Sequence, residues 1–292
     1  MNILVTGANG QLGSELRRLV KEGAGVPDEF IFTDVEELDI TDAEAVRHCV
    51  AEKRVGLIIN CAAFTAVDKA ESEPELCDLL NHRAPRLLAE TMAEVGGQLL
   101  HISTDYVFDG TAHRPYTEDA PTCPNSVYGR TKLLGEEALM EACPNSVIVR
   151  TAWLYSSYGN NFVKTMLRLG RERESLGVVA DQIGTPTYAR DLASALLQMV
   201  RHGLVPGIYH YSNEGVTSWY DFTREIHRQA GITSCRVSPL HTEDYPAPAP
   251  RPHFSVLDKT KIKATYGITI PWWADSLRNC LNELELQARD NK

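Results

Sequence analysis

The sequence predicts an α/β protein with a Rossmann-type, doubly wound parallel sheet and a smaller α/β lobe. Three observations support this fold class. A strand-like run at residues 2–6 passes through closely spaced glycines into a helix, short apolar segments alternate with longer segments of helical periodicity, and polar residues follow the apolar segments. The length of 292 residues is enough for both parts.

The first strand, at residues 2–6, leads into three glycines and then into an amphipathic stretch. The glycine spacing is close to the G-x-G-x-x-G fingerprint of dinucleotide-binding proteins. In that motif the glycines allow a tight turn and bring the backbone close to a pyrophosphate, which the N–H groups at the helix N-terminus bind. The segment predicts a cofactor-binding turn formed by Gly7, Gly10, Gln11, Leu12 and Gly13.

The second strand, at residues 29–33, ends at Asp34, about 20 residues after the last glycine. A carboxylate in this place accepts hydrogen bonds from the adenosine ribose and repels a 2′-phosphate. Because no Arg or Lys lies between residues 30 and 40, the sequence favours NADH over NADPH as the cofactor, with both left open. Asp39 and Ile40 precede a capping-box pattern and are expected near the adenine, with turn chemistry as an equal alternative for Asp39.

Short, continuously apolar segments predict strands that are buried on both faces of the sheet, at residues 57–61, 99–103 and 147–150. Helical periodicity predicts helices at residues 85–95, 162–173, 189–200, 218–230 and 273–286. In such a sheet, ligands bind beyond the carboxyl ends of the strands. Ala62, Ala63 and Thr104 follow strand ends, so we expect them at one common site.

Tyr128 and Lys132 are four residues apart in a segment with helical periodicity, residues 126–142. One helical turn would place the phenol and the ammonium on the same face. A nearby cation favours the phenolate, so Lys132 is expected to lower the pKa of Tyr128 from about 10 toward the range useful for proton transfer. Such a pair is common on solvated helix surfaces, and the glycine motif upstream favours a catalytic pair here.

The composition argues against several classes of function. A net charge of −10 argues against a surface for nucleic acid or for an anionic membrane. Seven cysteines without a C-x-x-C pattern predict reduced thiols instead of disulfides or a zinc site. No apolar run is long enough to span a bilayer, and a strand occupies the place of a signal peptide. We expect a cytoplasmic protein with a small-molecule ligand, and we assign no metal ligands.

These segments together resemble the extended short-chain dehydrogenase/reductase family and, within it, the dTDP-4-dehydrorhamnose reductase branch. The glycine motif and the Tyr128–Lys132 pair mark only the superfamily, whereas the blocks at residues 65–71 and 104–110 are far more specific. The resemblance extends nearly from end to end, through residues 61–64, 101–103, 150–155, 159–162, 181–187 and 251–258.

The resemblance implies NAD(P)H-dependent reduction of the C4 ketone of dTDP-4-dehydro-L-rhamnose to dTDP-L-rhamnose. In this reaction Tyr128 would protonate the alkoxide, Thr104 would hydrogen-bond the ketone, and Lys132 would also hold the nicotinamide ribose. A strand-end Thr that bonds only the backbone is the alternative for Thr104. Thr65 joins the residues expected to bind the cofactor.

The resemblance also implies residues that bind the nucleotide sugar. Asp105 is expected to contact a sugar hydroxyl, and Trp153 to pack on the sugar face or, alternatively, to fill the core. Asn161, Arg251 and Ser255 are candidates for the diphosphate region. Arg251 carries the most weight, because a guanidinium binds phosphate oxygens in a fork geometry.

The chain is expected to divide into two parts. The dinucleotide-binding domain would comprise residues 1–155 and 178–206, and the substrate-binding lobe residues 156–177 and 207–292. A homodimer joined through magnesium occurs in parts of the family, so a homodimer stays open. The sequence has no local cluster of ligands for such an ion, and Glu15 is expected to be an exposed acid of the first helix.

Other functions stay open. One is a non-catalytic, nucleotide-binding regulatory subunit resembling the methionine adenosyltransferase beta subunit, which shares much of this pattern. Another is an epimerase or reductase that acts on a different nucleotide-linked 6-deoxy-4-ketosugar. A dehydratase is disfavoured, because Tyr106 stands where the related dehydratases carry a glutamate.

Overall fold

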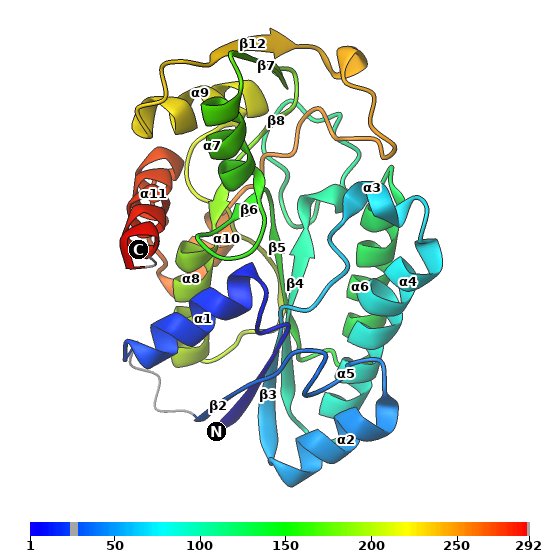
Figure 1. The fold of residues 1–292 in the computed structure, drawn as a ribbon. Helices are drawn as coiled ribbons and strands as arrows, with labels where there is room; N and C mark the ends of the chain where they lie inside the picture. Colours follow the sequence, from blue (N-terminus) through cyan, green and yellow to red (C-terminus); the bar gives the residue numbers. More distant parts are fainter. Residues whose placement is uncertain (24–28, 291–292) are drawn as a thin grey trace.

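A parallel sheet of six strands forms the centre of the molecule (Figure 1). The structure, a computed structural model, describes residues 1–23 and 29–290. The strands follow the order β10-β5-β4-β3-β1-β2, and every neighbouring pair is parallel. They are β1 (Asn2–Thr6), β2 (Glu29–Phe32), β3 (Val55–Asn60), β4 (Gln98–Thr104), β5 (Val147–Thr151) and β10 (Gly207–His210). The predicted Rossmann-type fold is confirmed.

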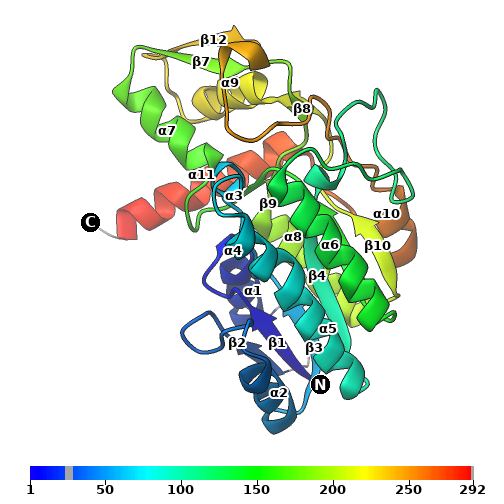
Figure 2. The same ribbon diagram turned by 90° about the vertical axis from the view of Figure 1, so that its right-hand side faces the viewer.

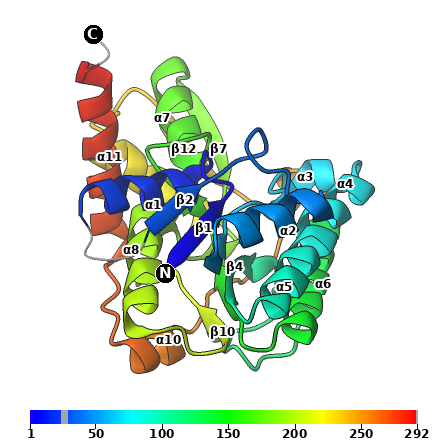
Figure 3. The ribbon, with the colours of Figure 1, turned by 90° about the horizontal axis from the view of Figure 1, so that it is seen from below.

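Helices cover both faces of this sheet, as the view in Figure 3 shows. Successive strand residues point to opposite faces, so Ile3 and Val5 join one core cluster and Leu4 joins the other. The first face is covered by α1 (Gln11–Lys21), α8 (Ala189–His202) and α10 (Thr260–Tyr266). The second face is covered by α2 (Ala43–Glu52), α5 (Ala84–Glu94) and α6 (Val127–Ala142). Between β3 and α5 lie α3 (Val67–Ala70), α4 (Pro74–Asp78) and a π-helix at Leu79–Arg83.

A smaller lobe stands above the carboxyl ends of the strands (Figures 1 and 2). Its parallel pair β7 (Ser175–Val179) and β12 (Arg236–Leu240) packs with α7 (Phe162–Glu172) and α9 (Trp219–Gln229). The long helix α11 (Trp273–Asp290) closes the same core cluster. Short pairs complete the connections: β6 (Leu154–Tyr155) with β9 (Thr187–Tyr188), and β8 (Ile183–Gly184) with β11 (Thr217–Ser218). Single turns of 3₁₀-helix lie at Asp105–Val107 and Thr242–Asp244.

The predicted helices are confirmed within a residue or two of their ends, except that α11 continues four residues beyond its expected end at residue 286. Two strands cross the expected division of the chain. Residues 207–210 were expected in the lobe, but β10 pairs with β5 at the edge of the central sheet. Residues 178 and 179 were expected in the cofactor domain, but they complete β7 and pair with β12. Both differences are decided by strand pairing over long sequence separations, which the periodicity of a segment does not contain.

Within the described ranges, no helix is long and apolar enough to cross a membrane.

The order of strands reverses between β1 and β3, since β2 lies outside β1 and β4 lies beyond β3. In open α/β sheets a crevice for ligands forms at such a reversal, at the carboxyl ends of the strands. The fold therefore predicts a ligand site formed by the segments that follow β1, β3, β4 and β5.

Candidate active site

The glycine turn after β1 is built for close approach of another backbone. Gly7 has a φ of +65°, and a Cβ on it would lie 2.6 Å from the backbone nitrogen of Ala62. A Cβ on Gly13 would lie 2.5 Å from the carbonyl oxygen of Gly7 and from the Cα of Ala8. No side chain caps the N-terminus of α1 at Gly10, which leaves its N–H groups for an anionic ligand. This cradle fits the pyrophosphate of a dinucleotide.

Asp34 lies on the outer side of this turn. Its Oδ2 accepts a hydrogen bond from the backbone N–H of Asn9 at 2.8 Å, and its Oδ1 accepts one from the N–H of Val35 at 2.9 Å. Arg17, which the sequence reasoning missed, donates from both terminal nitrogens to the side-chain oxygen of Asn9, each at 3.3 Å. Its guanidinium also lies over the ring of Phe32, 5.2 Å from the centroid. The carboxylate of Asp34 and the guanidinium of Arg17 therefore lie on either side of Asn9.

Asp39 and Ile40 are neighbours in the sequence but differ in their surroundings. Asp39 is exposed and accepts hydrogen bonds from the backbone N–H and the hydroxyl of Thr41, at 2.9 and 2.7 Å. This is the turn chemistry given as the alternative. Ile40 is 6% exposed and belongs to the core beneath α2 and α5. The side chain of Ile40 is therefore part of the core, and the expected adenine contacts of both residues stay a prediction.

A cavity of about 560 Å³ opens at the carboxyl ends of β1, β3, β4 and β5. Most of the predicted site residues line it: Gly7, Gly10, Gln11, Leu12, Ala63, Thr65, Thr104, Asp105, Tyr128, Lys132, Trp153 and Asn161. Gly13, Asp34, Asp39, Ile40, Ala62, Arg251 and Ser255 are not among its lining residues. Gly13 and Ala62 lie behind the glycine turn, where they hold it in shape. The cavity also contains Tyr106 and Trp219, which sequence reasoning did not assign to it.

Tyr128 and Lys132 enter the cavity from the first turns of α6. Ser126 begins this helix, and its hydroxyl accepts a hydrogen bond from the N–H of Gly129 at 3.1 Å. A Cβ on Gly129 would lie 2.3 Å from the carbonyl oxygen of Tyr106, so the helix packs directly on the segment after β4. Tyr128 in turn meets Tyr106 edge to face, with 5.5 Å between ring centroids. The cap and the glycine thus fix where the phenol lies.

The ionisation of the pair differs from the sequence expectation. Burial raises the pKa of Tyr128 above its usual value, and a hydrogen bond with the Thr104 side chain opposes this only in part. Burial lowers the pKa of Lys132 to about 8. The expected lowering of the Tyr128 pKa by Lys132 is therefore wrong for the chain alone, because desolvation is the larger effect on both groups. The buried phenol keeps its proton, as a proton donor requires.

Lys132 is held by strand β4. It is 1% exposed, and its Nζ donates to the carbonyl oxygen of Ile102 at 2.7 Å. The same nitrogen lies 3.1 Å from Nε2 of His101, which is fully buried. Sequence reasoning missed His101, because a histidine inside an apolar strand gives no signal of its partner on a later helix.

Thr104 and Asp105 lie side by side where β4 ends. The Thr104 hydroxyl donates to Asp105 Oδ1 at 3.0 Å. Asp105 is 2% exposed, and burial raises its pKa to about 6 against smaller opposing interactions, the first of them with Ser255. No residue of the described ranges bonds Asp105 Oδ2. Ser255 hydrogen-bonds this carboxylate and is 1% exposed, and its expected contact with a diphosphate stays a prediction.

Two tryptophans form one wall of the cavity. Trp153 adopts a φ of +49°, which is rare for a residue with a side chain. Its ring stacks on Trp219, with 3.5 Å between centroids and 10° between planes. A Cβ on Gly184 would lie 2.7 Å from the Trp153 ring, so the indole is packed on its other side as well. The Trp153 side chain therefore lines the cavity and also packs against the core of the lobe, which combines the two expected roles of contact surface and core residue.

Asn161 caps α7 at the border of the cavity. Its Oδ1 accepts from the N–H of Lys164 at 3.1 Å, and its Nδ2 donates to Ser156 O at 2.7 Å and to Gln11 Oε1 at 3.0 Å. These bonds occupy the amide and tie the lobe to the glycine turn. The cap explains the residue type, and its expected contact with a diphosphate gains no support from the structure.

Arg251 lies at a second hollow, of about 750 Å³, that shares Trp219 with the first cavity. Its Nη2 lies 2.8 Å from Asp68 Oδ2, and its Nη1 donates to the carbonyl oxygen of Ala249 at 3.1 Å. The Arg251 side chain is 22% exposed in this arrangement. Phe162 and Tyr245 line the same hollow, which combines aromatic rings with two cations, Arg173 and Arg251.

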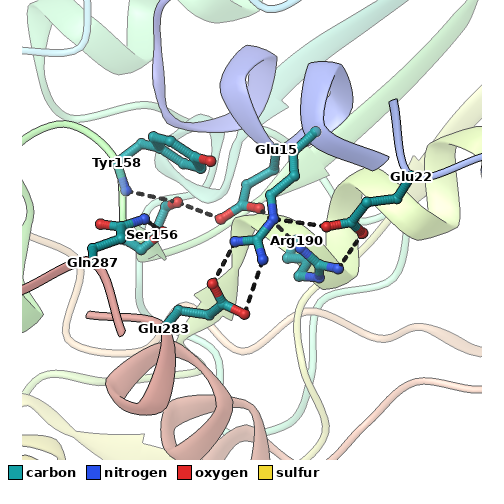
Figure 4. A network of polar contacts seen from close by, with 9 residues as sticks. Glu15, Glu22, Ser156, Tyr158, Arg190, Glu283 and Gln287 are labelled. Atoms are coloured by element: carbon teal, nitrogen blue, oxygen red, sulfur yellow. Dashed lines mark hydrogen bonds and ion pairs between the residues drawn. The ribbon is translucent and has the colours of Figure 1, made fainter. Parts of the chain in front are cut away.

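Glu15 is fully buried, so the expectation of an exposed helix acid is wrong. Its Oε1 accepts from the hydroxyl of Ser156 at 2.6 Å, and its Oε2 lies 3.9 Å from Arg190, which also pairs with Glu22 (Figure 4). Burial raises the pKa of Glu15. The network joins α1 and α8 to the loop before α7. Across the described parts of the chain, no three His, Cys, Asp or Glu residues are grouped so that they could hold a metal ion.

Comparisons with known proteins agree over nearly the whole chain. The sequence model of the RmlD substrate binding domain matches residues 1–286. A dTDP-4-dehydrorhamnose reductase of Streptomyces griseus is 47% identical over 280 residues, which cover 94% of this chain and 91% of that protein.

Two crystal structures are also similar. The dTDP-4-dehydrorhamnose reductase, an RfbD ortholog, of Clostridium acetobutylicum superposes with a TM-score of 0.93 at 46% identity, over 98% of this chain and 100% of that one. The dTDP-4-dehydrorhamnose reductase of Bacillus anthracis, in complex with NADP, gives 0.92 at 40% identity, over 97% of this chain and 99% of that one.

Proposed function

The chain belongs to the RmlD substrate binding domain family, and from this membership we propose that it is an NAD(P)H-dependent reductase that converts dTDP-4-dehydro-L-rhamnose to dTDP-L-rhamnose. The observation that carries the proposal is the meeting of Thr104, Tyr128 and Lys132 with the glycine turn in one cavity. A binding protein without catalysis has no need of a buried phenol, hydroxyl and amine beside a dinucleotide cradle. The regulatory-subunit alternative has no such observation in its favour.

The residues of the glycine turn would hold the dinucleotide, and Lys132 would hold its nicotinamide ribose. When bound, the nicotinamide supplies the hydride. We propose that both NADH and NADPH are accepted. Asp34 favours NADH by charge, but its Oδ2 already bonds the Asn9 backbone, and Arg17 lies on the other side of Asn9 with a fork suited to a phosphate. The related Bacillus anthracis enzyme was crystallised with NADP.

The chain's own residues would control the proton. Tyr128 would donate its phenolic proton to the oxygen that forms at C4, because burial keeps the phenol protonated until the substrate takes the proton. Thr104, which hydrogen-bonds Tyr128, would orient the carbonyl oxygen toward it. Asp105 would accept a hydrogen bond from a sugar hydroxyl with Oδ2, and the Trp153–Trp219 pair would cover the sugar face. General acid catalysis of this kind contributes about 10²–10⁴-fold to the rate.

The nucleotide would extend past Trp219 into the second hollow. Phe162 and Tyr245 offer aromatic surface to a thymine, and Arg251 offers a guanidinium to the phosphates. Asp68 pairs with Arg251 and is 46% exposed, so it can be displaced when a phosphate approaches. This continuity between the two spaces supports a nucleotide-linked sugar over a free sugar.

The test is oxidation of NADH and of NADPH by the purified protein with dTDP-4-dehydro-L-rhamnose, and identification of the sugar product. Tyr128→Phe is the matched variant: turnover should fall about 10²–10⁴-fold, while cofactor affinity by calorimetry stays near that of the wild type. Wild-type protein that binds cofactor without oxidising it in the presence of the ketosugar would favour the regulatory alternative. Full turnover in Tyr128→Phe would remove this residue from the mechanism.

A further inference from the structure

A buried chain of hydrogen bonds runs from the end of β3 to the side chain of Lys132. It begins at the backbone N–H of Ala62, which donates to Asn60 Oδ1 at 3.1 Å. Asn60 Nδ2 lies 3.0 Å from His101 Nδ1, and His101 Nε2 lies 3.1 Å from Lys132 Nζ. Asn60 and His101 are fully buried. The chain thus connects a backbone group that cannot change its protonation to an amine that can.

The backbone donor at Ala62 sets the direction of the later hydrogen bonds. Both Ala62 N–H and the Thr6 hydroxyl, the latter at 2.7 Å, point at Asn60 Oδ1. The amide nitrogen of Asn60 must therefore face His101 and donate to its Nδ1. A neutral imidazole that accepts at Nδ1 carries its proton on Nε2. That proton is directed at Lys132 Nζ.

Lys132 can accept this proton in only one of its two forms. An ammonium has three donors and no acceptor, whereas a neutral amine has a lone pair for His101 Nε2–H and still donates to Ile102 O. With the ammonium, two N–H groups would face each other at 3.1 Å in a buried place. We propose that His101 is a positioning residue that stabilises the neutral amine of Lys132 and so enables this lysine to return a proton to Tyr128.

The neutral amine of Lys132 has a consequence for the reductase reaction, which rests on the function proposed above. Once Tyr128 has given its proton to the product, it is a phenolate. Transfer of a proton from Lys132 Nζ to Tyr128 Oη restores the phenol and leaves the neutral amine, which accepts the hydrogen bond from His101. Water then supplies the proton that restores the ammonium. An ordinary lysine, with a pKa of about 10.4, would give up that proton far less readily near neutral pH.

The other charges around Lys132 do not produce this effect. Glu136 and Cys77 face the amine, and both favour its ammonium form. Glu136 is itself paired with Arg150, at 2.6 Å between charged atoms. Burial is the main cause that lowers the Lys132 pKa, and burial also keeps His101 neutral, with Lys132 as a smaller cause. The hydrogen-bond direction and the burial therefore act in the same sense.

NMR of the cofactor-free protein tests the proposal directly. The ¹⁵N shifts of His101 should identify the tautomer with its proton on Nε2. The ¹³Cε signal of Lys132, assigned by its loss in Lys132→Met, should titrate at least about one pH unit below an ordinary lysine. A proton on Nδ1 of His101, or an ordinary titration of Lys132, would overturn the proposal. These wild-type measurements decide the matter even if a variant does not fold.

Two variants test which atoms donate and which accept in the hydrogen bonds between Asn60, His101 and Lys132. Asn60→Asp is isosteric, but its carboxylate accepts from His101 Nδ1–H, so Nε2 becomes an acceptor for the ammonium of Lys132. The tautomer should reverse, and the Lys132 pKa should rise by about one unit or more. His101→Asn adds no charge; its oxygen can replace Nδ1 for Asn60, and no N–H reaches Lys132. Here the Lys132 pKa should rise as well.

Cys77→Ser is the matched control, since Cys77 is a neighbour of Lys132 that takes no part in the hydrogen bonds from Ala62 to Lys132. This variant should leave the His101 tautomer unchanged. An unchanged Lys132 titration in both Asn60→Asp and His101→Asn would contradict the proposal. The NMR results need no substrate, so they are independent of whether the ketosugar is reduced. If it is reduced, the basic limb of the kcat pH profile should move upward in both variants. A purely structural loss would lower kcat equally at all pH values.

Discussion

Replacement of Asp105 by asparagine should make the protein more stable and less active. Burial raises the pKa of this carboxyl from 3.8 to about 6, so the folded state binds a proton more tightly than the unfolded state. The folded state is therefore penalised as the pH rises through the range from 3.8 to about 6, and the penalty is complete above that range. Asp105→Asn removes the charge and keeps the acceptor for Thr104.

The size of the gain follows from the shift. At about 1.36 kcal/mol per pKa unit, a shift of about 2 units corresponds to about 3 kcal/mol at pH 8. At pH 5 the same group contributes about half as much, about 1.5 kcal/mol, because the wild-type carboxyl is then largely protonated in the folded state. Urea unfolding of both proteins at the two pH values measures the difference. Activity should fall about ten- to hundredfold in kcat/KM, the usual loss of a hydrogen bond to a charged group.

Asp109→Asn is a control in the same segment with the opposite sign. Its carboxylate accepts hydrogen bonds from the N–H and the hydroxyl of Thr111 and from Tyr116, and these lower its pKa. This variant should lose stability at pH 8. An Asp105→Asn protein that is no more stable than the wild type at pH 8, or whose gain does not grow from pH 5 to pH 8, would refute the reasoning for Asp105.

Three further results are expected. Asp34→Ala should raise the NADPH/NADH ratio of kcat/KM because it removes the charge that repels a 2′-phosphate, and Arg17→Ala should lower that ratio; equal ratios in all three proteins would remove both residues from cofactor selection. Arg251→Ala should weaken dTDP binding in calorimetry and leave NADH binding unchanged, since its guanidinium lies in the second hollow; equal dTDP affinity would contradict that placement. Glu136→Gln breaks a buried ion pair with Arg150, in which each side chain is 3% exposed. The free energy of unfolding, measured by urea titration, should fall by about 3–5 kcal/mol. A smaller loss would mean that the Arg150 guanidinium finds another partner.

Local patterns in the sequence determined the fold class and much of the cavity. The alternation of apolar strands and amphipathic helices, the spacing of Gly7, Gly10 and Gly13, and the Tyr128–Lys132 turn are properties of residues close together in the chain. Parallel strands bring their carboxyl ends to one edge, so the position of Thr104 after an apolar strand is enough to predict that it lies at the same edge of the sheet as the glycine turn.

Contacts over long sequence separations were decided only by the tertiary structure. The pairing of β10 with β5, the stack of Trp153 on Trp219 and the position of His101 beside Lys132 each need two distant segments to meet. The ionisation of the site residues was likewise decided only by the tertiary structure. The sequence placed Lys132 beside Tyr128 and predicted a lowered phenol pKa, but desolvation of both groups reverses that expectation. Desolvation depends on everything packed around a group, and a spacing of four residues does not contain it.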